Sequence, residues 1–171
     1  AYGTLQGLMA ALQVKYGNEE VGNYSYAVQG VGHVGMEFVK LLRERGAKVF
    51  VTDINTDLVQ RAVDDHGAEA VAPDQIYDVD AEVYSPCALG GTVNANTLPR
   101  LKCKIICGAA NNQLANDEIG DEVERLGEVF HQELERSARD DGHRLEGPPQ
   151  VRQHVDDVVE RGSGRWIIDD R

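Results

Sequence analysis

A cluster of glycines directly after an apolar, alternating run is the feature that most limits how this chain can fold. The run is YSYAVQG, and the glycines are Gly30, Gly32 and Gly35. Glycine loses much backbone entropy on folding and adds no side chain to a core, so the cluster needs a reason other than packing. A run of β-formers, then a glycine-rich turn, then an amphipathic stretch predicts a strand, a tight turn and a helix in succession.

Strands and helices are expected to alternate along most of the chain. Residues 1–16 have the apolar spacing of a helix that Gly17 can end. Further helices are expected from Val34 to Gly46, from Asn55 to Gly67 and over residues 118–126. Strands are expected at residues 24–30, 47–53, 70–71, 82–84, 104–107 and 128–130. This order predicts an α/β fold with a doubly wound, mainly parallel sheet and helices on both faces.

The composition of the sequence changes after about Phe130, where charged residues dominate. We expect a sheet domain at residues 1–130 and a charged helical tail at residues 131–171, with one helix beginning near Gln132 and another at residues 151–162. The tail is too polar to form a core alone, so it either packs on the sheet domain or is loosely ordered. Its His and Asp spacing matches no compact zinc site, so no metal is predicted and a solvated charged surface is favoured.

Composition and charge narrow the range of partners. Hydrophobic residues make up 42% of the 171 residues, which indicates a globular protein. The formal net charge of −12 repels nucleic acid and anionic membranes, so neither is an expected partner. No apolar run approaches the length of a membrane span and no secretory leader is present, which predicts a soluble, cytoplasmic protein. Cys87, Cys103 and Cys107 fit no disulfide framework and are expected as reduced core thiols.

The spacing Gly30-x-Gly32-x-x-Gly35 is typical of a Rossmann-type dinucleotide-binding domain. In such a unit, Gly30 permits the tight turn, Gly32 lets a pyrophosphate approach the backbone, and Gly35 lets the helix lie close to the strand. The helix N-terminus then offers unpaired N–H groups and a positive dipole end to the phosphates. His33 in the same loop either contacts a phosphate when protonated or is an exposed loop residue. A purely structural glycine turn is the alternative.

Asp53 is the second feature that favours a dinucleotide. It ends the second predicted strand, 23 residues beyond Gly30, where an acidic residue is expected to bind the adenosine ribose hydroxyls. A phosphate on the ribose 2′-oxygen would face this carboxylate, and two like charges about 4 Å apart repel by roughly 4 kcal/mol at an effective dielectric constant near 20. The nearest cation that follows is Arg61. We therefore predict NAD rather than NADP as the cofactor.

Longer stretches of the sequence resemble a known family. SPCALGG at residues 85–91, GAANNQLA at residues 108–115, GVGHVG and GAKVFVTDIN look like the C-terminal, NAD-binding domain of the leucine/phenylalanine/valine dehydrogenases, within the glutamate dehydrogenase superfamily. The resemblance covers roughly residues 1–130. It implies reversible oxidative deamination of a branched-chain or aromatic L-amino acid to its 2-oxo acid, with NAD.

The resemblance also implies which positions bind the cofactor. Residues 30–35 would surround the pyrophosphate, residues 53–54 would meet the adenosine ribose, residues 87–88 would lie along the adenosine side, and residues 109–111 would approach the nicotinamide half. Without the resemblance, the two asparagines at 111–112 are equally well explained as turn formers. The predicted cofactor-binding residues are Gly30, Val31, Gly32, His33, Val34, Gly35, Asp53, Ile54, Cys87, Ala88, Ala109, Ala110 and Asn111.

The sequence departs from the family at both ends. The lysines and aspartate that bind and deprotonate the substrate in the family come from a domain that would precede Ala1, so no catalytic residue is assigned here. After Phe130, HQELERSARDDG stands where the family has an Asn-Ala-Gly-Gly stretch and a helix that shapes the substrate pocket. We expect an NAD-binding domain that lacks its catalytic domain, is inactive alone and forms a homo-oligomer when complete. The alternative is a non-catalytic module that senses NAD or binds a partner.

Overall fold

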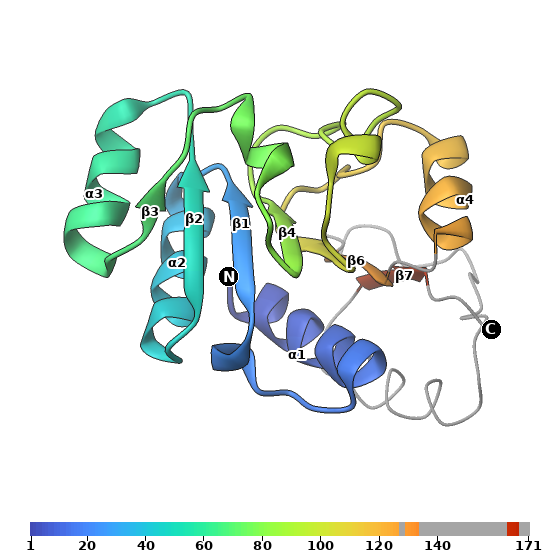
Figure 1. Ribbon diagram of the computed structural model, residues 1–171, viewed down its shortest axis with the longest axis horizontal. Coiled ribbons are helices and arrows are strands. Elements are labelled where there is room, and N and C mark those ends of the chain that lie inside the picture. The colour runs from blue at the N-terminus through green and yellow to red at the C-terminus, as the bar shows by residue number, and fades with distance from the viewer. Residues whose placement is uncertain (127–128, 134–163, 168–171) are drawn as a thin grey trace.

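One sheet forms the centre of the protein. The computed structural model describes residues 1–126, 129–133 and 164–167. Its strands are β1 (Ser25–Gln29), β2 (Lys48–Thr52), β3 (Glu69–Ala70), β4 (Val83–Pro86), β5 (Ile105–Gly108), β6 (Val129–Glu133) and β7 (Gly164–Ile167). They are ordered β3-β2-β1-β4-β5-β6-β7 (Figure 1). Strands β1 to β6 pair in parallel and β7 is antiparallel to β6, so the predicted doubly wound, mainly parallel sheet is confirmed.

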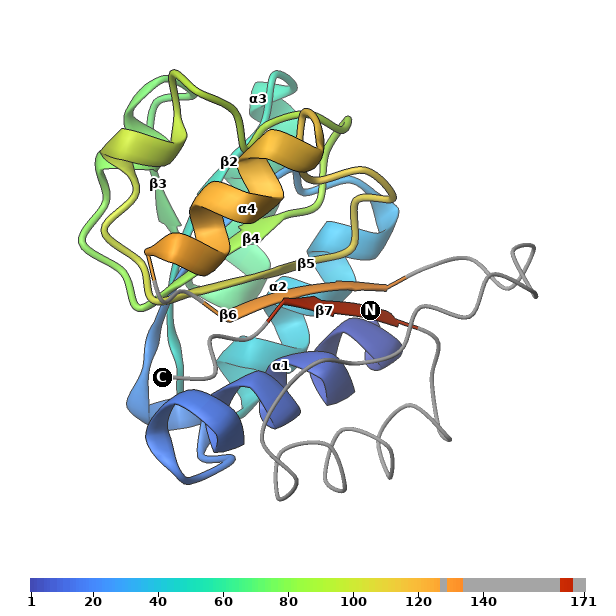
Figure 2. The same cartoon turned by 90° about the vertical axis from the view of Figure 1, so that its right-hand side faces the viewer.

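Helices cover both faces of this sheet. The α-helices are α1 (Tyr2–Tyr16), α2 (His33–Glu44), α3 (Thr56–His66) and α4 (Asp117–Arg125), and the 3₁₀ helices are η1 (Val21–Asn23), η2 (Gln75–Asp78) and η3 (Leu98–Arg100). One core cluster joins α1, α2 and α3 to one face of the sheet. A second cluster joins η2, η3 and α4 to the other face. Figure 2 shows α1 and α4 on opposite sides of the strands.

Local signals set the ends of several helices. Gly17 and Gly67 end α1 and α3 with φ values of 73° and 68°, in the left-handed region that glycine adopts without strain. The Asn55 side chain accepts hydrogen bonds from the backbone N–H groups of Asp57 and Leu58, and so caps α3. Asn116 caps α4 in the same way, through a 3.0 Å bond from the Ile119 N–H group. The helix boundaries therefore lie close to those expected from sequence.

The chain after Phe130 differs from the expectation. A helix was predicted to begin near Gln132, but Gln132 and Glu133 belong to β6, which pairs with β5 on one side and β7 on the other. Pairing of the backbone with two neighbouring strands overrides the polar composition of this segment. Strand β6 also crosses the predicted domain boundary at residue 130, and the division into two domains stays a prediction. The helix expected at residues 151–162 lies outside the described residues.

The cysteines form no disulfide, and all three lie in the described part of the chain. Cys103 and Cys107 are buried, as expected for core thiols, and Cys87 is only partly buried at the end of β4. Burial raises the pKa of the Cys87 thiol to about 11, so the thiol is protonated at neutral pH. None of the helices in the described ranges is both long and apolar enough to span a membrane.

Candidate functional site at the carboxyl ends of the strands

Two of the three glycines between β1 and α2 are required by the fold itself. Gly30 has a φ of 98°, which strains any residue with a side chain. A Cβ atom on Gly30 would also lie 2.6 Å from the backbone nitrogen of Ala88, in the loop after β4. A Cβ atom on Gly35 would lie only 2.0 Å from the carbonyl oxygen of Gly30. These contacts give Gly30 the tight turn and Gly35 the close helix packing predicted for them.

Gly32 is different, because nothing in the described protein requires a glycine there. Its φ of −64° suits any residue, and a Cβ atom would meet no atom within 4 Å. Gly32 is also the N-cap of α2, where it offers no side chain to bond the first backbone N–H groups. Open space in front of uncapped N–H groups is the arrangement that an incoming phosphate needs.

Asp53 holds the glycine loop in place. Its Oδ2 accepts a 2.8 Å hydrogen bond from the Val31 N–H group, and its Oδ1 accepts a 2.9 Å bond from the Asn55 N–H group. Next to it, the Gly30 N–H group donates to the Thr52 carbonyl oxygen over 2.8 Å. Each carboxylate oxygen keeps a further lone pair, so the group retains acceptor capacity for ribose hydroxyls. The bond to Val31 joins positions 22 residues apart and was not predicted from the sequence.

The other residues around the glycine loop differ in how far they are exposed to solvent. Val31 is fully buried, and its backbone N–H group is held by Asp53. His33 is exposed at the first position of α2, and its contact with a phosphate stays a prediction. Val34 is 45% exposed and Ile54 is 95% exposed. Both side chains therefore leave apolar surface open beside the glycine loop.

The predicted residues after β4 and β5 lie at the same edge of the sheet. The Cys87 N–H group donates to the Gln29 carbonyl oxygen over 2.7 Å, and the Ala110 N–H group donates to that of Pro86 over 3.0 Å. The ends of β1, β4 and β5 are thereby joined side by side. Ala88 and Asn111 are exposed, Ala109 is half-buried and Ala110 is buried. Leu89, which was not predicted, is 87% exposed next to Ala88.

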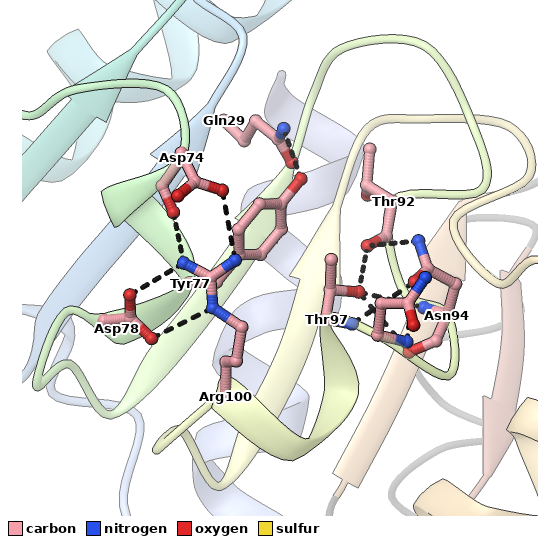
Figure 3. A network of polar contacts seen from close by, with 9 residues as sticks. Gln29, Asp74, Tyr77, Asp78, Thr92, Asn94, Thr97 and Arg100 are labelled. Atoms are coloured by element: carbon pink, nitrogen blue, oxygen red, sulfur yellow. Dashed lines mark hydrogen bonds and ion pairs between the residues drawn. The ribbon is translucent and has the colours of Figure 1, made fainter.

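A polar network that the sequence did not reveal supports the end of β1 (Figure 3). The Gln29 amide donates to the Tyr77 hydroxyl over 2.8 Å and accepts a hydrogen bond from the Tyr84 hydroxyl. The Arg100 guanidinium lies 5.2 Å from the centroid of the Tyr77 ring. Gln29 directly precedes Gly30, so these contacts fix the strand from which the glycine turn begins.

The Arg100 guanidinium also joins η3 to η2. It forms two bonds with the Asp78 carboxylate, at 3.1 and 2.7 Å, and one of 3.1 Å with the Asp74 carboxylate (Figure 3). The hydrogen bond from Arg100 lowers the pKa of Asp78 below its usual value. This planar, paired geometry is strongly directional, and it holds the two 3₁₀ helices together on one face of the sheet.

The loops after β4 and β5 are bonded to one another. The Gly91 N–H group donates to the Asn112 carbonyl oxygen over 2.6 Å, and the Val93 N–H group donates to that of Gln113 over 3.0 Å. On the β4 side, the Thr97 hydroxyl donates to the Thr92 carbonyl oxygen over 2.6 Å (Figure 3). The position of Asn111 therefore depends on both loops.

Together these elements make an edge that offers hydrogen-bond donors and acceptors to a ligand. The glycine loop offers backbone donors, Asp53 offers a carboxylate, and residues 88, 89 and 111 surround the ends of β4 and β5. Within the described ranges, no group of three or more His, Cys, Asp or Glu side chains could hold a metal ion. His143 and His154 of the tail lie outside the described residues. The arrangement suits an elongated ligand with phosphates and a ribose.

The chain was compared with known protein families, proteins and solved structures. No protein-family model matches the chain. Leucine dehydrogenase from Bacillus cereus is 48% identical over 130 residues, which are 76% of this chain and 36% of the relative. Phenylalanine dehydrogenase from Bacillus thermotolerans is 40% identical over 135 residues, 76% of this chain and 35% of the relative.

A solved structure agrees with these sequence matches. The crystal structure of L-tryptophan dehydrogenase from Nostoc punctiforme aligns with a TM-score of 0.73 and 34% identity, over 75% of this chain and 39% of that one. The chain thus spans little more than a third of the length of the relatives it matches. Over three quarters of its length, this protein is a homologue of the leucine, phenylalanine and tryptophan dehydrogenases, and it has their Rossmann-type fold.

Proposed function

We propose that this chain is the NAD-binding domain of an amino-acid dehydrogenase that deaminates a branched-chain or aromatic L-amino acid to its 2-oxo acid. The observation that carries the proposal is Gly32, a glycine that faces open space at the uncapped start of α2 and that the fold does not require. Asp53 beside it supports a ribose-bearing ligand. The homologues, all named as dehydrogenases of amino acids, support the substrate class of the whole protein.

The residues of this chain would bind and orient the cofactor. The backbone N–H groups at the start of α2 would hold the pyrophosphate, and Asp53 with Ile54 would meet the adenosine ribose. Residues 87–88 would lie along the adenosine side, and residues 109–111 would meet the nicotinamide half. When bound, NAD accepts a hydride from the substrate. The groups that bind the amino acid and move its protons are expected in the part of the relatives that this chain does not match.

The choice of NAD over NADP follows from the charge at Asp53. Both carboxylate oxygens are fixed by backbone N–H groups, so the side chain cannot turn away from a 2′-phosphate without breaking those bonds. Of the two cationic residues of α2, Arg43 donates to the carbonyl oxygens of Ala47 and His66, and Lys40 pairs with Glu37. A 2′-phosphate would therefore meet a held negative charge, which disfavours NADP.

Calorimetric titration of the full chain tests this function. We expect NAD to bind and NADP to bind at least about tenfold more weakly, a difference of about 1.4 kcal/mol. Equal affinities for the two dinucleotides would refute the role of Asp53 in selecting NAD. If neither dinucleotide binds, the proposed function is wrong.

A further inference from the structure

Gln113 is a fully buried polar residue for which no role was predicted from the sequence. It follows the loop that leaves β5, and its side chain has no exposed surface. The Nε2 atom donates a 2.7 Å hydrogen bond to the carbonyl oxygen of Gly108, the last residue of β5. The amide therefore ties the far end of the loop back to the strand that it leaves, and residues 109–112 form a closed turn between them.

The backbone of Gln113 fixes the same turn from a second side. Its carbonyl oxygen accepts the 3.0 Å bond from the Val93 N–H group, and the Ala115 N–H group donates to the Val93 carbonyl oxygen over 2.9 Å. Val93 and Leu114 form a parallel bridge between these loops. The turn after β5 is thus held against the loop after β4 by a short backbone ladder.

Gly90 shows how closely the two loops approach. A Cβ atom on Gly90 would lie 1.8 Å from the side-chain Oδ1 and 2.4 Å from the carbonyl oxygen of Asn112. The carbonyl oxygen of Asn112 also accepts the 2.6 Å bond from the Gly91 N–H group. No room is left for a side chain at position 90, so any larger residue must displace the turn that carries Asn111.

We propose that Gln113 is a positioning residue that sets the direction of residues 109–111 toward the nicotinamide half of the dinucleotide. This inference rests on the proposed function. Gln113 cannot touch the cofactor, because its side chain is fully buried. It acts through the Gly108 carbonyl group, from which the backbone of the nicotinamide segment departs. A buried hydrogen bond is directional, so its loss frees the turn.

The test separates the two halves of the cofactor. Gln113→Met keeps an unbranched side chain of similar length and removes the hydrogen-bond donor. The full chain of the variant and of the wild type is titrated with NAD and with ADP-ribose, which lacks nicotinamide. We expect the variant to bind NAD about tenfold more weakly, the cost of about one buried hydrogen bond. Its affinity for ADP-ribose should stay within about twofold of the wild type, because ADP-ribose lacks the nicotinamide that residues 109–111 are proposed to meet. Gln60→Met on the exposed surface of α3 is the matched control and should leave both affinities unchanged.

Gly90→Ala displaces the same turn from the opposite loop, and it serves where Gln113→Met does not fold. It should produce the same selective loss for NAD. A variant that weakens NAD and ADP-ribose equally, or neither, would overturn the inference, and so would a wild-type chain that binds both ligands equally well. A wild-type chain that binds neither ligand would instead overturn the proposed function.

Discussion

At the scale of single residues, the candidate site contains two glycines that the fold requires and one glycine that it does not require. Gly30 and Gly35 cannot carry a side chain without meeting backbone atoms. Gly32 can carry one, so its value lies in what approaches from outside. Asp53 combines two roles, because the carboxylate that would bind the ribose already orders the glycine loop through Val31.

Gly32→Ala separates folding from binding. We expect its free energy of unfolding to fall by no more than about 1 kcal/mol, the cost of replacing glycine by alanine at an N-cap. Its NAD affinity should fall at least about tenfold, because the new methyl group occupies the path of the pyrophosphate. Urea unfolding and calorimetry measure the two effects. Gly35→Ala is the contrasting variant and should destabilise the fold itself. A Gly32→Ala chain that binds NAD as the wild type does would contradict this account of the glycine.

Asp53→Ala tests the structural half of the Asp53 role. The substitution leaves the Val31 and Asn55 N–H groups without their acceptor, so we expect a loss of about 1–3 kcal/mol in the free energy of unfolding. Asp65→Ala on the exposed surface of α3 is the control and should have little effect. The comparison uses urea unfolding without any nucleotide. An unchanged stability in Asp53→Ala would show that the carboxylate does not order the loop.

At the scale of elements, sequence predicted best where the signals are local. The run from β1 through α3 was located to within a few residues, because alternation, the Asn55 cap and the terminal glycines are encoded next to each element. Strand β6 was predicted too short, because its last residues are extended through pairing with β5 and β7. Composition alone cannot reveal a partner strand that lies thirty or more positions away in the chain.

For the candidate site, too, the local features could be predicted from the sequence and the contacts between distant segments could not. The glycine positions and Asp53 follow from spacing alone, and the family resemblance indicated residues 87–88 and 109–111. The bond from Val31 to Asp53 and the amide of Gln113 were missed, since each depends on how separate strands are brought together. Leu89 was missed as well, because its exposure is known only once the loop after β4 is in place.

The contact between Glu82 and Ser25, the first residue of β1, predicts a dependence of stability on pH. Its Oε2 accepts bonds from the Ser25 N–H group at 2.8 Å and from the Ser25 hydroxyl at 2.5 Å. Burial raises the pKa of Glu82, but the bonds from Ser25 outweigh it, and the net pKa lies below the ordinary value of 4.5. A lowered folded-state pKa means that this stabilisation is complete above pH 4.5 and is lost as the pH falls through the folded-state pKa.

Urea unfolding of Glu82→Gln at several pH values measures this contribution. The variant should be less stable than the wild type at pH 7, and the difference should shrink as the pH falls below about 4.5. Glu124→Gln, at an exposed position on α4, is the control and should follow the wild type. A gap between Glu82→Gln and the wild type that is constant over this range would contradict the assignment.

At the scale of the whole molecule, the chain corresponds to little more than a third of its dehydrogenase relatives. In the proposed function, its described edge would bind and orient a dinucleotide. The assembly of the complete protein as a homo-oligomer, and the separate tail at residues 131–171, stay predictions.

We expect the purified chain to bind NAD and to form no NADH with L-leucine, L-phenylalanine or L-tryptophan. The reason is that the groups which would bind the amino acid and remove its protons are proposed to lie in the unmatched part of the relatives. The near-ultraviolet absorbance of NADH measures the reaction, with a full-length relative as the positive control. Amino-acid-dependent NADH formation by this chain would contradict the proposed division of labour.

The central claim is that the turn between β1 and α2 receives the phosphates of a dinucleotide, and amide NMR spectra recorded during an NAD titration test it most directly. The account predicts that the largest shift changes fall on the backbone N–H groups of Gly32, His33 and Val34, followed by Ile54 and Asn111. Saturating NAD that leaves the amides of the glycine loop unmoved would contradict it.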